Sequence, residues 1–118
     1  MRAALVAAAL IAMVVRPASA ASGFSTTSGF LELYGNGESL IPRMYIRGIG
    51  DGIDMYNTMV QAEGAAGVYC PPNKVGIVHA QYVSIIKAFV AKVPKAKDLP
   101  VAGVLLYALK DAFPCQGQ

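Results

Sequence analysis

The sequence predicts an all-α protein, a small bundle of about four helices with one disulfide bond, and three observations support this prediction. Apolar residues recur at three- or four-residue spacing in several stretches, which is the period of one helix face. Clusters of Gly, Pro and Asn separate these stretches, and no alternating apolar and polar run indicates a strand. The chain has only two cysteines, Cys70 and Cys115, so a single intramolecular bridge is available.

The N-terminus has the pattern of a secretory signal peptide. Arg2 precedes an unbroken apolar run over residues 3–15, and Arg16 and Pro17 separate that run from the triplet Ala18-Ser19-Ala20. The run is shorter than the about 20 residues of a membrane-spanning helix, and an uncleaved anchor is the alternative. We therefore expect cleavage of residues 1–20, which releases an exported chain with a flexible segment, 21–28, and one helical domain, 29–118.

The charge of the mature chain excludes two classes of partner. The full sequence has ten Lys and Arg against seven Asp and Glu, and Arg2 and Arg16 leave with the signal, so eight basic side chains remain. A chain so close to neutral has no basic field that would attract nucleic acid or a membrane surface. We therefore expect neither as a partner.

The two cysteines are interpreted as a structural disulfide. In an oxidising compartment, a Cys70–Cys115 bridge would close a loop of 45 residues, which stabilises a domain by roughly 4 kcal/mol. The alternative is a thiol nucleophile or half of a metal site. Neither cysteine has a Cys-x-x-Cys or Cys-x-x-His neighbour, so we expect no metal at this pair.

Two helices are expected before the first cysteine. Residues 25–28 offer N-caps to a short helix over 29–34, and the Gly-Asn-Gly sequence at 35–37 ends it. A second helix runs from Glu38 or Ser39 to Ala62, with Pro42 in its first turn. One side of this helix carries a row of apolar and small residues: Leu40, Met44, Gly48, Gly52, Met55 and Met59.

Two glycines in that row have two possible roles. Gly48 and Gly52 are four positions apart, so they would let another helix approach the backbone closely. Phosphate binding is the alternative, but the spacing is not Gly-x-Gly-x-x-Gly and no strand precedes it. We therefore interpret these glycines as a helix-packing site, and expect no cofactor.

Two more helices are expected around the cysteines. Asn73 caps a third helix that ends at about Val93, and its apolar face is made by Val75, Val78, Tyr82, Ile85, Ile86, Phe89 and Val93. Residues 94–97 form a turn. Asp98 then caps a fourth helix, which Pro114 ends, and its buried face is Val101, Val104, Leu105, Ala108, Leu109 and Phe113. If these two helices are antiparallel neighbours, the start of one lies beside the end of the other and the sulfurs can meet.

No catalytic set of residues can be assembled from the sequence. His79, the only histidine, lies beside an apolar face and is interpreted as a structural or surface residue. Asp51 and Asp54 could serve as a carboxylate dyad, but they have no histidine at helical spacing, so they are better explained as a solvated edge or as charges that recognise a partner. Arg43 and Arg47 make a similar exposed pair. We therefore expect no enzyme.

Several short motifs together resemble the Rap/Tai type of immunity proteins, small exported helical proteins associated with type VI secretion. The motifs are Tyr45-Ile46-Arg47-Gly48-Ile49-Gly50-Asp51-Gly52, Cys70-Pro71-Pro72, Val75, the segment at 85–90, Pro94, and Ala108-Leu109-Lys110-Asp111-Ala112-Phe113-Pro114-Cys115. The similarity extends from about Phe30 to Cys115.

The resemblance implies a periplasmic protein that blocks a peptidoglycan-cleaving amidase toxin by occupying its active site, often as a homodimer. Candidate contacts for such a partner are Arg43, Arg47, Asp51 and Asp54, and the connection from Glu63 to Tyr69, which we expect to be flexible and exposed. Two alternatives remain. One is a small periplasmic chaperone of the acid-resistance type, although this chain has few titratable residues for an acid trigger. The other is a secreted enzyme that uses Asp51, Asp54 or His79.

Overall fold

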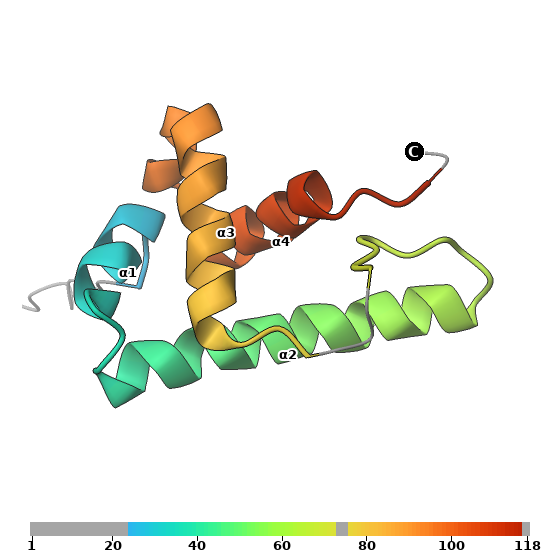
Figure 1. The fold of residues 1–118 in the computed structure, drawn as a ribbon, viewed down its shortest axis with the longest axis horizontal. Helices are drawn as coiled ribbons and strands as arrows, with labels where there is room; N and C mark the ends of the chain where they lie inside the picture. Colours follow the sequence, from blue (N-terminus) through green and yellow to red (C-terminus); the bar gives the residue numbers. More distant parts are fainter. Residues whose placement is uncertain (1–23, 73–75, 117–118) are drawn as a thin grey trace, which may run out of the picture.

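The computed structural model describes residues 24–72 and 76–116, which contain four α-helices and one 3-10 helix and no strand. The elements are α1 (Thr27–Tyr34), α2 (Leu40–Ala62), α3 (His79–Lys92), the 3-10 helix η1 (Pro94–Asp98) and α4 (Val101–Ala112). The long α2 forms the base of the molecule, and α3 stands across it (Figure 1). The all-α prediction is confirmed. The predicted signal peptide, 1–20, and the predicted cap Asn73 lie outside the described residues.

The segment before α1 is more ordered than the sequence indicated. Thr26 Oγ1 accepts a hydrogen bond from Gly29 N at 3.1 Å, so Thr26 caps a helix that begins at Thr27 rather than at Gly29. The N–H and the hydroxyl of Thr27 both donate to Leu99 O, at 2.9 and 2.8 Å. These bonds tie Thr26 to α1 and Thr27 to the chain before α4, within the 21–28 segment that the sequence predicted to be flexible.

Helix α2 has the predicted length but not the predicted inner face. It begins at Leu40 with Pro42 in the first turn and ends at Ala62. Its buried residues are Pro42, Ile46, Gly50 and Asn57, whereas Leu40, Met44, Met55 and Met59 are each more than half exposed. The prediction failed because α2 carries apolar residues on two opposite sides, and helical spacing fits either side equally well.

The close approach of another helix occurs at Gly50. A side-chain carbon at Gly50 would collide with the ring of Tyr82, so the missing side chain is what lets α3 cross α2 at this point. Apart from the adjacent residues and the backbone of α2 itself, no atom of the described chain comes within 4 Å of a side-chain carbon placed at Gly48 or Gly52. Gly48 and Gly52 both face outward, so the close helix packing predicted at these two glycines is not made within the chain.

The starts of α3 and α4 also differ from the prediction. Helix α3 begins at His79, and the N–H of Val78 donates to Gln81 Oε1 at 2.9 Å at its first turn. The predicted turn at 94–97 is part of η1, and Asp98 ends η1 instead of capping α4, whose cap is Pro100. Leu99 separates the two helices, and its carbonyl is used by Thr27.

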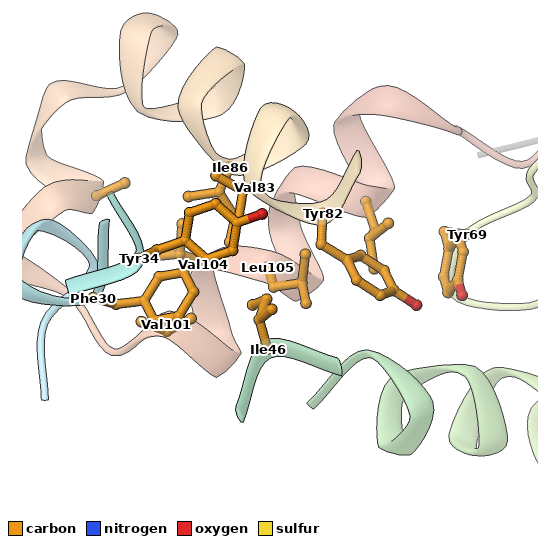
Figure 2. Packing of buried hydrophobic residues seen from close by; sticks show 12 residues of the cluster. Phe30, Tyr34, Ile46, Tyr69, Tyr82, Val83, Ile86, Val101, Val104 and Leu105 are labelled. Atoms are coloured by element: carbon orange, nitrogen blue, oxygen red, sulfur yellow. The ribbon is translucent and has the colours of Figure 1, made fainter. Parts of the chain in front are cut away.

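One apolar core joins all four α-helices. Figure 2 shows Phe30 and Tyr34 from α1, Ile46 from α2, Tyr82, Val83 and Ile86 from α3, and Val101, Val104 and Leu105 from α4. Fully burying an aliphatic or aromatic side chain stabilises a fold by about 1.5–3 kcal/mol, so this cluster contributes strongly to the stability. Five residues of the predicted α4 face are buried: Val101, Val104, Leu105, Ala108 and Leu109. The sixth, Phe113, is only half-buried because it follows the end of the helix.

Candidate interaction site

The connection that follows α2 is folded back along the helix by one buried side chain. Asn57 Nδ2 donates to Tyr69 O at 3.0 Å, and Asn57 Oδ1 accepts from the N–H groups of Val68 and Tyr69. A single asparagine therefore satisfies three backbone groups that would otherwise be buried without partners. Sequence reasoning missed Asn57. The signal that could have found it is a lone amide on the same helix face as Ile46 and Gly50.

The predicted disulfide is present and anchors the far end of this connection. Cys70 and Cys115 are bridged, with their Cα atoms 4.9 Å apart, and the N–H of Cys70 donates to Phe113 O at 2.8 Å. The bridge ties the chain after α2 to the chain after α4. It does not directly join the start of α3 to the end of α4, as the antiparallel arrangement had suggested, because α3 begins only at His79.

The connection from Glu63 to Tyr69 is exposed in only its first half. Residues 63–66 are exposed, but Gly67 and Tyr69 are buried, and Tyr69 is 1% exposed. The prediction of a fully exposed connection is therefore wrong at Tyr69, because Asn57 and the disulfide hold this residue against α2 and α4. An exposed tip at 63–66 remains available to a partner.

A polar hollow of about 510 Å³ lies between α2, the connection and the start of α3. Asp51, Asp54 and Thr58 of α2 line it on one side, and Tyr69 and Tyr82 contribute phenol groups. The Tyr69 hydroxyl donates to Asp54 Oδ1 at 3.1 Å. Asp51, Asp54 and Tyr69 were all predicted as partner contacts, and the structure brings these three together. It does not bring Arg43, Arg47 or Glu63 into the hollow.

The acids of the hollow act on both tyrosines. Burial raises the pKa of Tyr69 well above its usual value, and the negative charge of Asp54 and its hydrogen bond raise it further. Burial likewise raises the pKa of Tyr82, and the charges of Asp54 and Asp51 add to this effect. Both phenols therefore stay protonated at neutral pH and can donate hydrogen bonds.

A second feature is the outer face of α2, which we define as Leu40, Ile41, Met44, Met55, Tyr56 and Met59. Each of these side chains is more than half exposed. Gly48 and Gly52 lie between the two ends of this face and leave its middle without side chains. Scattered exposed apolar residues are ordinary, but several along one helix are typical of an interaction surface.

The remaining predicted residues have separate surroundings. Tyr45 stacks on Phe24 with ring centres 4.5 Å apart. Phe113 helps line a second, apolar hollow of about 370 Å³ beside α3, and Pro114 is exposed. Arg43 is half-buried and its Nε makes no hydrogen bond within the described residues, whereas Arg47 is exposed.

The single histidine has a structural contact, as predicted. His79 Nδ1 lies 2.8 Å from the hydroxyl oxygen of Tyr34, which is buried in the core. This bond links the first residue of α3 to the end of α1.

The described residues also show what the arrangement can do chemically. Within residues 24–72 and 76–116, no group of three His, Cys, Asp or Glu side chains comes together to hold a metal ion. Over the same ranges, no helix is both long and apolar enough to cross a membrane. What the geometry offers is a rigid framework with an acidic hollow on one side of α2 and an apolar outer face beside it, which suits recognition of a partner.

Comparison with known proteins assigns the chain to a protein family. The family model of the Rap1a immunity proteins matches residues 28–115, which is most of the chain. The match begins one residue after the start of α1 and ends at Cys115, so it includes all four α-helices and the disulfide. No curated protein and no solved structure matches the chain.

Proposed function

Because the chain belongs to the Rap1a immunity protein family, we propose that it binds and blocks a peptidoglycan-cleaving amidase toxin of type VI secretion. The observation that carries this proposal is the family match over residues 28–115. Proteins of this family are non-catalytic inhibitors, so the function requires a surface and a rigid scaffold. The core, the disulfide and the Asn57 hydrogen bonds supply such a scaffold.

We place this activity in the periplasm. The support is the sequence pattern of residues 1–20, together with two cysteines that form a bridge in an oxidising compartment. A toxin that cleaves peptidoglycan acts in that same compartment, so an inhibitor located there meets its target.

The proposal is tested with the chain carrying a C-terminal tag and expressed in the bacterium that encodes it. Purification from the periplasm should recover a peptidoglycan amidase, and the purified chain should abolish its turnover at equimolar ratio. A host that makes the amidase in its periplasm should survive only when the chain is co-expressed. Recovery of the chain without any hydrolase, together with no protection of the host, would refute the proposal.

We also propose that two copies pair along the outer face of α2. The residues of this face are arranged almost symmetrically about Gly50: Gly48 with Gly52, Met44 with Tyr56, and Ile41 with Met59 stand equally far from it in the sequence. In an antiparallel pair of α2 helices, Gly48 of one copy would therefore lie opposite Gly52 of the other. Small residues at that point let two backbones approach closely.

A bulky side chain at the centre of this face tests the pairing. The Gly52→Leu variant should be a monomer in sedimentation velocity at concentrations where the unchanged protein is a dimer. Gly103→Leu is the matched control, because Gly103 is also a helical glycine with no atom within 4 Å. A dimer that persists in Gly52→Leu would exclude this face.

The alternative of an acid-activated chaperone receives no comparable support. Such a chaperone needs many groups that titrate on acidification, and the sequence has one histidine and seven Asp and Glu. Assaying the aggregation of a client protein at low pH, with and without the chain, distinguishes the two functions.

A further inference from the structure

The polar hollow beside α2 contains charge that the described chain does not neutralise. Asp51 and Asp54 are three positions apart on α2, so their side chains are neighbours on one side of the helix. Within the described residues, the ion pair is Lys92–Asp111, which lies elsewhere, and neither acid of the hollow has a basic partner. Two adjacent carboxylates without a cation repel each other, and a bound cation would relieve that repulsion.

A second observation at the same hollow also indicates a ligand. Tyr82 is 3% exposed, yet its hydroxyl makes no hydrogen bond within the described residues. The ring of Tyr82 is buried, but this residue also lines the hollow, so a group that enters the hollow can reach its unpaired hydroxyl. Figure 2 shows the hydroxyls of Tyr82 and Tyr69 both directed toward α2, which carries Asp51 and Asp54. The Tyr69 hydroxyl is bonded to Asp54, and that of Tyr82 remains available.

From these two observations we propose that the hollow receives the guanidinium group of an arginine side chain from the protein partner. A guanidinium has five N–H donors in one plane and accepts nothing, which matches a site of acceptors. The carboxylate of Asp51, the second oxygen of Asp54 and the hydroxyl oxygen of Tyr82 can each accept one of those donors. The hollow, at about 510 Å³, is large enough for an arginine side chain and the backbone that carries it.

The chemistry also separates arginine from other ligands. An anion would be repelled by the two carboxylates, and a neutral amide would leave their charge uncompensated. The hollow lies on the side of α2 between the core and the outer face, so an arginine could enter it while α2 remains paired with a second copy. That the arginine belongs to an amidase rests on the proposed function, whereas the binding of a guanidinium does not.

The first experiment measures the hollow alone. The isolated chain is titrated with N-acetyl-arginine amide and followed by the NMR signals of the Gly76 amide and the Tyr82 ring. We expect saturable shifts with a Kd on the order of 1 mM, as is usual for a fragment of this size. N-acetyl-citrulline amide has the same shape without the charge and should bind at least tenfold more weakly. Equal shifts with both compounds would overturn the proposal.

Three variants assign the binding to the named groups. Asp51→Asn and Asp54→Asn should each weaken the arginine probe at least tenfold, and Asp54→Asn keeps an oxygen for the Tyr69 hydroxyl, so the fold is retained. Tyr82→Phe removes only the free hydroxyl and should weaken the probe severalfold. Glu32→Gln is the matched control, since it makes the same change of charge at an exposed position on α1 and should have no effect. Unchanged affinity in both aspartate variants would overturn the proposal.

The chain itself could supply the cation, and one further variant distinguishes this source. Lys74 lies outside the described residues, and in the sequence it stands between Pro71 and Gly76, which both line the hollow. Binding of the arginine probe that appears only in Lys74→Gln would show that an internal lysine occupies the site, and would refute the proposal. Binding in the unchanged protein supports an external arginine.

The last experiment separates the inference from the function on which it draws. An amidase captured by the chain should bind the Asp51→Asn, Asp54→Asn double variant at least tenfold more weakly than the unchanged protein, as measured by calorimetry. An amidase that binds both equally would refute the inference and leave the proposed function intact. If no amidase is captured but the arginine probe binds, the proposed function fails and the guanidinium site stands.

Discussion

The side chain of Asn57 pairs with the backbone of Tyr69 on both sides, donating to its carbonyl oxygen at 3.0 Å and accepting from its N–H at 3.2 Å. The side-chain amide of Asn57 thus makes the pair of backbone hydrogen bonds that a residue of a neighbouring strand makes in a β-sheet. The pairing holds the chain after α2 close to the helix and thereby shapes the wall of the acidic hollow.

Replacing Asn57 should therefore destabilise the folded protein. In Asn57→Ala, the N–H and the carbonyl of Tyr69 lose their partners while still buried, so the free energy of unfolding should fall by about 2–4 kcal/mol. Urea unfolding followed by circular dichroism measures this change. Thr58→Ala is the control, because Thr58 is exposed and its hydroxyl only returns to Asp54 O, so we expect a loss of less than about 0.5 kcal/mol. Equal losses in the two variants would contradict the role given to Asn57.

Gly50 and Gly103 should respond oppositely to the same substitution. Gly103→Ala removes a flexible residue from an exposed helix position and should stabilise the protein by about 0.5–1 kcal/mol. Gly50→Ala gains the same helix propensity, but its methyl group meets the Tyr82 ring, and overpacking of this kind costs about 1–3 kcal/mol. Thermal unfolding should show a higher Tm for Gly103→Ala and a lower Tm for Gly50→Ala. A stabilised Gly50→Ala would mean that α3 does not cross α2 at this residue.

Loss of the disulfide should destabilise the domain without changing its core. The bridge closes a loop of 45 residues, for which the chain-entropy model gives about 4 kcal/mol. The Cys70→Ser, Cys115→Ser double variant should unfold at a correspondingly lower urea concentration, and reducing agent should shift the unchanged protein to the same midpoint. If reducing agent has no effect on the unchanged protein, the bridge does not contribute in solution.

Stability should fall at alkaline pH because of the two buried tyrosines. Their pKa values are raised in the folded protein, so the folded state keeps both protons when the unfolded chain begins to lose them near pH 10. Their contribution is therefore fully present below pH 10 and is lost as the pH rises further, by at most about 1.4 kcal/mol for each tyrosine per pH unit. Urea unfolding at pH 9 and pH 11 measures the loss.

The phenylalanine variants provide the control for this pH dependence. Tyr69→Phe and Tyr82→Phe should each reduce the loss between pH 9 and pH 11, since neither variant has that proton to release. Tyr107→Phe should not change it, because Tyr107 is largely exposed on α4. If the free energy of unfolding falls by the same amount between pH 9 and pH 11 in the unchanged protein and in all three variants, groups other than Tyr69 and Tyr82 cause the fall.

The sequence was sufficient for the features that depend on local patterns. The length of α2, the buried face of α4 and the cysteine pair follow from helical spacing, proline positions and the count of cysteines. The start of α3 was placed too early, because its N-cap Val78 has no polar side chain and therefore gives no capping signal in the sequence, whereas asparagine is a strong capping residue. The bond from Val78 N to Gln81 Oε1 was not considered.

Features that depend on contacts between residues far apart in the sequence could not be predicted from local patterns. Tyr69 looks like a loop residue in the sequence, and its burial depends on Asn57, which is twelve positions away on another element. The choice of Gly50 over Gly48 and Gly52 as the point of close approach depends on where Tyr82 of α3 meets α2. The acidic pair is visible in the sequence, but the free hydroxyl of Tyr82 beside it becomes apparent only once α2 and α3 are placed together.

The use of both cysteines within one molecule limits how copies can associate. The sequence contains no third cysteine, and neither of the two is free. No covalent link between molecules can therefore form through sulfur, even in an environment that promotes oxidation. Any larger assembly must be held by non-covalent contacts, and should migrate at the mass of a single chain on a denaturing gel run without reductant.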